Sequence, residues 1–235
     1  MPSSLITTKD LEVDDDEQQN QQQQQNHDLS ENKMNNNSKA SDSTVPPEIL
    51  SLSFNQDGGC LAIGLTTGFM ICNVYPFQEA FHRNTEGSGG IGLVEMLFRC
   101  NLLALVGGGP HPKYPRNKVM LWDDHRGKPI GELSFRQNVL NVKLRRDRVV
   151  VVLYDRIYLY NFSDLTLLDQ IPTMANPKGL VCLSPDNTGS TDATNGGSSG
   201  GGGVLACPSI HRGGVRVELY GWRKTQLIDA HEGPF

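Results

Sequence analysis

Short apolar runs separated by turn-forming residues make up most of this chain beyond position 47. Residues 93–98, 102–106 and 118–122 are three such runs, bounded by Gly, Pro, Asn or Asp. Runs of this length between such residues predict buried or half-buried β-strands. The loop 107–115 is rich in Gly and Pro and is predicted to hold no regular structure. No stretch has the spacing of a long amphipathic helix, so an all-β fold is expected.

A four-residue turn motif recurs along the same region. Its copies are Phe54-Asn-Gln-Asp57, Phe98-Arg-Cys-Asn101, Leu144-Arg-Arg-Asp147 and Leu183-Ser-Pro-Asp186. Each copy ends a predicted strand and closes with Asp or Asn, whose side chain can bond nearby backbone amides. The copies are 44, 46 and 39 residues apart, and blades of WD-repeat propellers recur every ~40–45 residues.

The remaining strands complete four quartets. After each turn we expect a second strand (60–65, 102–106, 149–154, 204–207), a third (69–74, 118–122, 157–162, 215–220) and a weaker outer strand (80–83, 130–135, 166–171, 225–229). The run from Val149 to Leu153 is apolar on both faces, as expected of a strand between neighbouring blades. The predicted fold is a partial β-propeller with blades near 48–85, 91–136, 137–173 and 178–230.

Two segments lack the residues that a folded core needs. Residues 1–47 are rich in Gln, Asn and acids, and we expect them to form a disordered tail. Residues 187–203 are rich in Gly and Ser, which predicts a flexible insert in the fourth blade.

The tail has nine acidic and three basic residues, and the rest has 17 acidic and 18 basic residues. A body this close to neutrality argues against nucleic acid as a partner.

The chain also lacks the usual patterns of enzymes and metal sites. Its three consecutive glycines at 107–109 are not followed by the Lys-Ser/Thr of a phosphate loop, and no G-x-S-x-G occurs. The histidines are scattered and no C-x-x-C pair exists, so no metal or other cofactor is expected. No apolar run approaches the ~20 residues that span a bilayer. We therefore expect a non-enzymatic protein whose membrane contact, if any, is peripheral.

These residues resemble the PROPPIN family, called WIPI proteins in animals. The likeness rests on LVEMLFR-x-NLLALVGGG followed by KVMLWDD, on residues 52–57, on Asn176-Pro-Lys-Gly179 and on Ala230-His231, and it covers roughly 50–235. PROPPINs are seven-bladed propellers, so the resemblance implies about four of seven blades and a C-terminally truncated member. It also implies an autophagy scaffold acting in autophagosome formation at membranes that carry phosphatidylinositol 3-phosphate or 3,5-bisphosphate. The expected location is cytoplasmic and peripheral, at the pre-autophagosomal structure and at vacuole or endosome membranes.

The resemblance also nominates site residues. His231 matches the family histidine that assists one lipid headgroup, but the Arg-Arg-Gly motif that grips the headgroups lies beyond the present sequence. Arg145 and Arg146 look similar, yet they occupy the turn register and precede Asp147, so no lipid role is assigned to them. We expect lipid binding by this chain to be weak or absent.

Asn55 and Asp57 match the family surface that docks a large autophagy lipid-transfer protein. A turn capped by its own Asp explains the same residues equally well. Arg136, Lys143, Arg145, Arg146 and Arg148 form a local basic concentration, read either as a solvated rim or as a patch for phosphate or an acidic partner. The leading hypothesis is a phosphoinositide-directed scaffold. The alternative is an interaction-only protein that binds the lipid-transfer partner without binding lipid itself.

Overall fold

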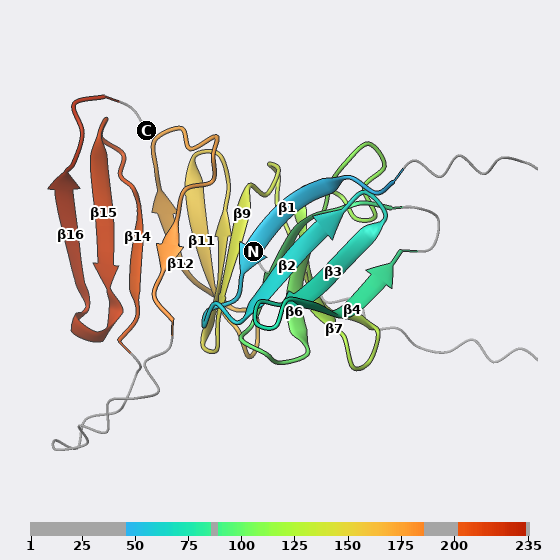
Figure 1. Cartoon of the computed structure of the whole chain (residues 1–235). Coiled ribbons are helices and arrows are strands. Elements are labelled where there is room, and N and C mark those ends of the chain that lie inside the picture. Colours follow the sequence, from blue (N-terminus) through green and yellow to red (C-terminus); the bar gives the residue numbers. More distant parts are fainter. Residues whose placement is uncertain (1–45, 86–88, 186–201, 234–235) are drawn as a thin grey trace, which may run out of the picture. The chain divides into compact units, whose positions relative to one another are not determined.

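The computed structural model describes residues 46–85, 89–185 and 202–233 of the 235, and these residues form four antiparallel sheets of four strands each (Figure 1). In every sheet the strands lie side by side in chain order, and all pairs of neighbours are antiparallel. The first sheet holds β1 (Ile49–Phe54), β2 (Cys60–Leu65), β3 (Gly68–Asn73) and β4 (Gln78–Asn84). The second holds β5 (Ile91–Met96), β6 (Leu102–Gly107), β7 (Lys118–Asp123) and β8 (Lys128–Ser134).

The third and fourth sheets repeat this arrangement. The third holds β9 (Asn141–Arg145), β10 (Arg148–Val152), β11 (Arg156–Asn161) and β12 (Leu167–Pro172). The fourth holds β13 (Cys182–Leu183), β14 (Val204–Pro208), β15 (Gly214–Leu219) and β16 (Lys224–Asp229). Among the described residues the only helix is the short 3-10 turn η1 (Tyr220–Trp222), and none is long and apolar enough to cross a membrane.

The strand quartets predicted from the pattern are confirmed, with several boundaries shifted by one or two residues. Two of these shifts have a clear local cause. The strand expected at 93–98 runs from Ile91 to Met96, because the turn begins at Leu97 and Phe98 adopts a positive φ of 49°. The strand expected at 149–154 ends at Val152, because the Leu153 amide already donates to Arg156 across the next turn. The predicted tail 1–47 and insert 187–203 lie outside the described residues, apart from residues 46, 47, 202 and 203.

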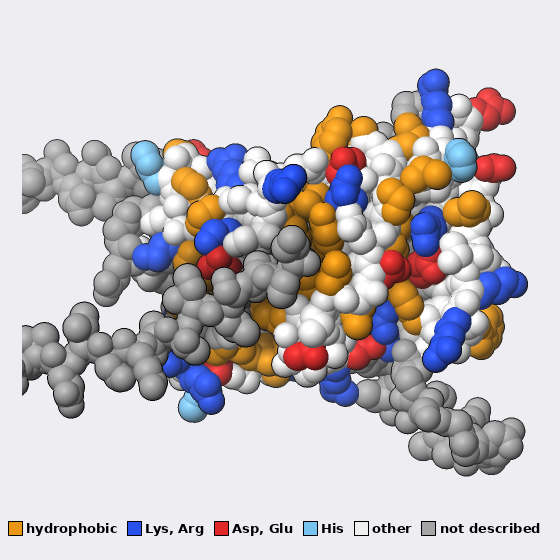
Figure 2. All heavy atoms as spheres, turned by 180° about the vertical axis from the view of Figure 1, so that it is seen from behind, with side chains coloured by type: hydrophobic (Ala, Val, Ile, Leu, Met, Phe, Trp, Pro, Cys, Tyr) orange, Lys and Arg blue, Asp and Glu red, His pale blue; other side chains and the backbone are white. Residues whose placement is uncertain are grey.

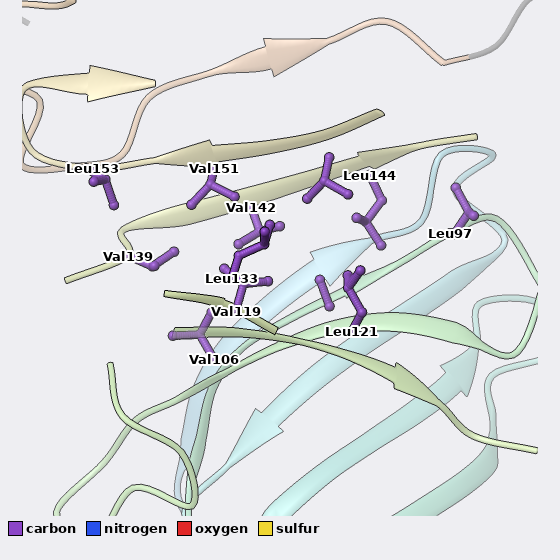
Figure 3. Packing of buried hydrophobic residues seen from close by; sticks show 12 residues of the cluster. Leu97, Val106, Val119, Leu121, Leu133, Val139, Val142, Leu144, Val151 and Leu153 are labelled. Carbon is purple, nitrogen blue, oxygen red and sulfur yellow. The ribbon is translucent and has the colours of Figure 1, made fainter. Parts of the chain in front are cut away.

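Apolar side chains from facing sheets form the core between neighbouring blades. Alternation along β6 sends Leu103 and Leu105 toward the first sheet, and Ala104 and Val106 toward the third. Figure 3 shows the cluster between the second and third sheets, where Val106, Val119 and Leu121 face Val142, Leu144 and Val151. In β10, Val149 and Val151 belong to this cluster, and Val150 and Val152 belong to the next one. The prediction of a strand sandwiched between two blades is therefore confirmed.

The first strand of each sheet lies on the inner side of the stack. β1 and β2 both contact β5, β5 contacts β9, and β9 contacts β13. The Trp122-Asp123 pair closes β7 as predicted, because the Asp123 carboxylate accepts hydrogen bonds from the backbone amides of His125 and Arg126 at 3.0 and 3.2 Å. Each blade is thus closed by local turns, and the blades are joined through their first strands.

The Asn176-Pro-Lys-Gly179 turn connects the third and fourth sheets. The Asn176 side chain accepts from the Leu180 amide at 2.8 Å and donates to the Leu180 carbonyl at 3.0 Å. Gly179 has a φ of 62°, and a Cβ there would lie 2.9 Å from the Leu140 carbonyl oxygen. The expectation that Gly179 occupies a position requiring free φ is confirmed.

Candidate interaction surface

Turns from three consecutive sheets meet at one place, which we call the three-turn cluster: residues 55–59, 97–101 and 145–148. Gln56 holds them together. Its amide donates to the carbonyl oxygens of Met96 at 2.7 Å and of Leu144 at 2.9 Å, and its side-chain oxygen accepts from the Phe98 amide at 2.5 Å. One side chain of the first sheet therefore fixes the positions of turns in the second and third.

Asn55 occupies a structural position in this cluster. Its side chain accepts from the Cys60 amide at 2.9 Å and donates to the Phe98 carbonyl at 3.1 Å, and the residue is only 4% exposed. Both ends of the amide are thus used within the fold. Asn55 caps its own turn and ties it to the second sheet, so it presents little surface to a partner.

Asp57 lies at the surface beside Arg99 of the second sheet. The Asp57 carboxylate accepts from the Gly59 amide at 2.8 Å and pairs with Arg99 at 3.3 Å, and the two side chains are 46% and 58% exposed. Gly59 makes room for the guanidinium, because a Cβ there would lie 1.9 Å from Arg99 Nη2. The Gly59 hydrogen bond, with help from Asn55 and Arg99, lowers the pKa of Asp57, so the carboxylate is charged at neutral pH.

The basic residues of the third sheet contact neighbouring sheets. Arg145 is only 3% exposed, pairs with Asp147 at 3.1 Å and lies against Gly203, which directly precedes β14 of the fourth sheet. The guanidinium of Arg146 stands 4.7 Å from the ring centre of Phe98, and that of Arg148 stands 4.0 Å from the ring centre of Tyr220. The interpretation as a solvated rim is therefore wrong for Arg145, because its side chain fills space between sheets.

An ion pair with a buried carboxylate and a partly exposed lysine joins β5 to β9. Lys143 Nζ lies 2.9 Å from Glu95 Oε2, and Glu95 is buried. Burial raises the pKa of the Glu95 carboxyl, and Lys143 opposes this effect. The pair shows that Lys143 joins the second and third sheets.

His231 lies after β16 of the fourth sheet, away from the β1–β2 turn in the fold. It is exposed, and its backbone amide donates to the Gly213 carbonyl at 2.9 Å, as does the amide of Ala230 at 3.0 Å. The structure thus unites Asn55 and Asp57 in one turn and places His231 in a different sheet.

Sequence reasoning missed Gln56 and Arg99 as members of the cluster. Gln56 stands between two nominated residues in the turn motif, and this position was the available signal.

On the face shown in Figure 2, Lys and Arg side chains are scattered among acidic and apolar ones. The described residues contain no group of His, Cys, Asp or Glu suited to a metal ion.

Four-stranded antiparallel sheets that follow one another along the chain and pack face to face define a protein of the β-propeller class. Solved structures share this fold, and two of them serve as examples. One is Kluyvelomyces marxianus Hsv2, with a TM-score of 0.62 at 24% identity, covering 80% of this chain and 53% of that one. The other is KlAtg21 in complex with the coiled-coil of AgAtg16, with a TM-score of 0.61 at 23% identity, covering 80% and 58%.

The chain belongs to the PROPPIN family, because the sequence model of that family matches residues 49–211. Among its curated relatives, Autophagy-related protein 18e of Arabidopsis thaliana is 36% identical over 186 residues. That match covers 79% of this chain and 46% of the relative, so the chain spans about half the length of the protein it matches. The family resemblance stated from the residues is thereby confirmed.

Proposed function

We propose that this chain acts as a non-enzymatic scaffold of the autophagy machinery, docking a large lipid-transfer protein at the three-turn cluster. The observation that carries the proposal is Asp57, an exposed, charged carboxylate beside Arg99 on a turn held rigidly by Gln56. A rigid pair of opposite charges offers a basic or amide-rich segment a defined contact without a cost of ordering the site.

The scaffold would work at membranes marked by phosphatidylinositol 3-phosphate or 3,5-bisphosphate, from the cytoplasmic side, at the pre-autophagosomal structure and at vacuole or endosome membranes. This part rests on family membership and on the autophagy-related name of its plant relative. His231 is its single candidate for headgroup contact within the present sequence.

A second candidate is an interaction-only protein that holds the partner without binding lipid. Arg145 and Arg146 favour it, because one is buried against Asp147 and the other stacks over Phe98. Neither arginine presents the open fork that binds phosphate in two places. The KlAtg21 structure contains a coiled-coil of AgAtg16, which makes a coiled-coil a further partner to test.

The experiment is capture of the purified lipid-transfer protein by the full chain and by two matched variants. Asp57→Asn keeps the oxygen that accepts from Gly59 but removes the charge. Asp164→Asn does the same in the β11–β12 turn, where Asp164 accepts from the Thr166 amide at 3.0 Å.

The proposal predicts weaker capture for Asp57→Asn and unchanged capture for Asp164→Asn. No capture by the unaltered chain, or equal capture by both variants, would count against it. Sedimentation with vesicles containing phosphatidylinositol 3-phosphate separates the two candidates. Binding that falls on changing His231→Ala supports the lipid-directed scaffold, and absence of sedimentation supports the interaction-only protein.

A further inference from the structure

A separate cavity opens between the second and third sheets, at the ends of β8 and β11. It measures about 420 Å³ and is lined by Ser134, Phe135, Arg136, Gln137, Leu153, Arg156 and Tyr158. Sites for small ligands commonly span ~300–1,000 Å³, so the cavity is large enough to hold a side chain and its terminal group. None of these lining residues belongs to the three-turn cluster.

The cavity gathers hydrogen-bond donors that the fold leaves available. Among the contacts of the described residues, Arg136 and Gln137 have no hydrogen-bond or ion-pair partner, and both are exposed. Arg156 is held by Asp155, with Nε 3.1 Å from Oδ1. One guanidinium is thus unpaired. The second is oriented by Asp155 and by the side chain of Tyr158, and these two partners engage only part of its fork.

The carboxylates around the cavity do not cancel this positive charge. Ser134 donates to Glu132 at 2.9 Å, and Glu132 is neutralised by Lys118 at 2.6 Å. Asp155 balances Arg156, which leaves the charge of Arg136 uncompensated. An oxyanion is the group that two guanidiniums and a side-chain amide bind best.

The walls of the cavity favour a peptide over a membrane as the source of that oxyanion. Phe135 and Tyr158 pack with ring centres 5.3 Å apart, and Tyr160 lies 6.2 Å from Phe135, which forms an aromatic wall. None of the lining residues is an exposed large apolar side chain that could enter a bilayer. β8 is the outer strand of its sheet, so its free edge can pair with an extended chain.

We propose that this cavity binds the phosphate of a phosphorylated peptide. Arg136 and Arg156 grip the phosphate oxygens, Gln137 donates a further hydrogen bond, and the peptide backbone runs along the edge of β8. The site serves a partner other than the one docked at the three-turn cluster.

Calorimetry with the full chain tests this site, using a phosphoserine peptide and the same peptide without phosphate. The phosphorylated peptide is expected to bind and the other is not. Arg136→Gln and Arg156→Gln should each weaken binding at least about tenfold, as expected when a charge-assisted contact is lost. Arg212→Gln, an exposed arginine in the β14–β15 loop, is the matched control and should leave binding unchanged.

Two further arms make the outcome decisive. Inorganic phosphate should displace the phosphopeptide, and vesicles of phosphatidylcholine with phosphatidylinositol 3-phosphate should bind equally to the unaltered chain and to Arg136→Gln. The proposal is overturned if the phosphopeptide fails to bind, if both cavity variants bind it normally, or if Arg136→Gln lowers vesicle binding alone. Arg136 makes no contact needed for folding, so its variant stays informative even if Arg156→Gln unfolds.

Discussion

Three adjacent polar residues, Asn55, Gln56 and Asp57, have different tasks in one turn. Asn55 is buried and bonded at both ends, Gln56 bridges to two other sheets, and Asp57 faces solvent beside Arg99. A change at each position should therefore affect stability and binding in different proportions. Asn55→Ala would remove a buried cap, so it is a poor test of partner binding.

Gln56→Ala should destabilise the protein without creating a large cavity. It removes three hydrogen bonds to the second and third sheets, and each such bond contributes about 1 kcal/mol. We expect the free energy of unfolding to fall by about 2–3 kcal/mol in urea titrations. Gln78→Ala on the exposed strand β4 is the control and should change it by under about 0.5 kcal/mol. Equal effects of the two changes would contradict the bridging role.

Glu95 should make stability depend on pH in a defined direction. Burial raises the pKa of its carboxyl above the ordinary 4.5, with Lys143 opposing. A carboxyl whose folded-state pKa is raised contributes stability below its unfolded pKa and loses that contribution as pH rises through the folded pKa. The unaltered chain should therefore lose stability relative to Glu95→Gln as pH rises from 4.5 toward neutrality.

Glu132 provides the control of opposite sign. Hydrogen bonds from Lys118 and Ser134 lower the pKa of its carboxyl, so its contribution is present above pH 4.5 and is lost as pH falls through the folded pKa. Chemical denaturation at a series of pH values gives the free energy of unfolding of the unaltered chain minus that of each variant. As pH rises, this difference should fall for Glu95→Gln and rise for Glu132→Gln. Slopes of the same sign would show that the assigned environment of Glu95 is wrong.

At the scale of the elements, hydrophobic pattern and turn residues were sufficient to predict most of the blades. The strand Cys60–Leu65 begins and ends where its apolar run does, and the alternation in Arg156–Asn161 matches its burial. The end of β5 could not be predicted, because Phe98 is apolar but leaves the strand with a positive φ. The environments of Arg145 and Gln56 were also inaccessible, since they depend on which turns of other sheets lie nearby.

The connection between the third and fourth sheets offers a test at this scale. Gly58 and Gly179 both have positive φ, at 69° and 62°, but only Gly179 faces a close backbone atom. Alanine should cost about 1–2 kcal/mol at either site from the left-handed conformation. The clash with Leu140 should make Gly179→Ala the more destabilising change in thermal unfolding. A smaller loss for Gly179→Ala than for Gly58→Ala would contradict the packing described for the Asn176–Gly179 turn.

At the scale of the whole folded body, contacts between sheets couple blades that are each built from local pairings. The cores between sheets, the Gln56 bridge and the Lys143–Glu95 pair all cross from one blade to the next. Strands in the middle of a sheet, such as β2, β6 and β10, are paired at both edges, and β6 and β10 are also covered by neighbouring sheets on both faces. Outer strands have one free edge, and their amides should open more readily.

Hydrogen exchange of the full chain, alone and with the lipid-transfer protein, tests the central claim most directly. The central claim is that the chain folds into stacked propeller blades and that the three-turn cluster docks a partner. Alone, the amides of β2, β6 and β10 should exchange far more slowly than those of β4, β8 and β12, the outer strands of the same three blades. With the partner, exchange should slow at residues 55–59, 97–101 and 145–148. Protection that does not repeat from blade to blade, or a slowing confined to other segments, would contradict the account.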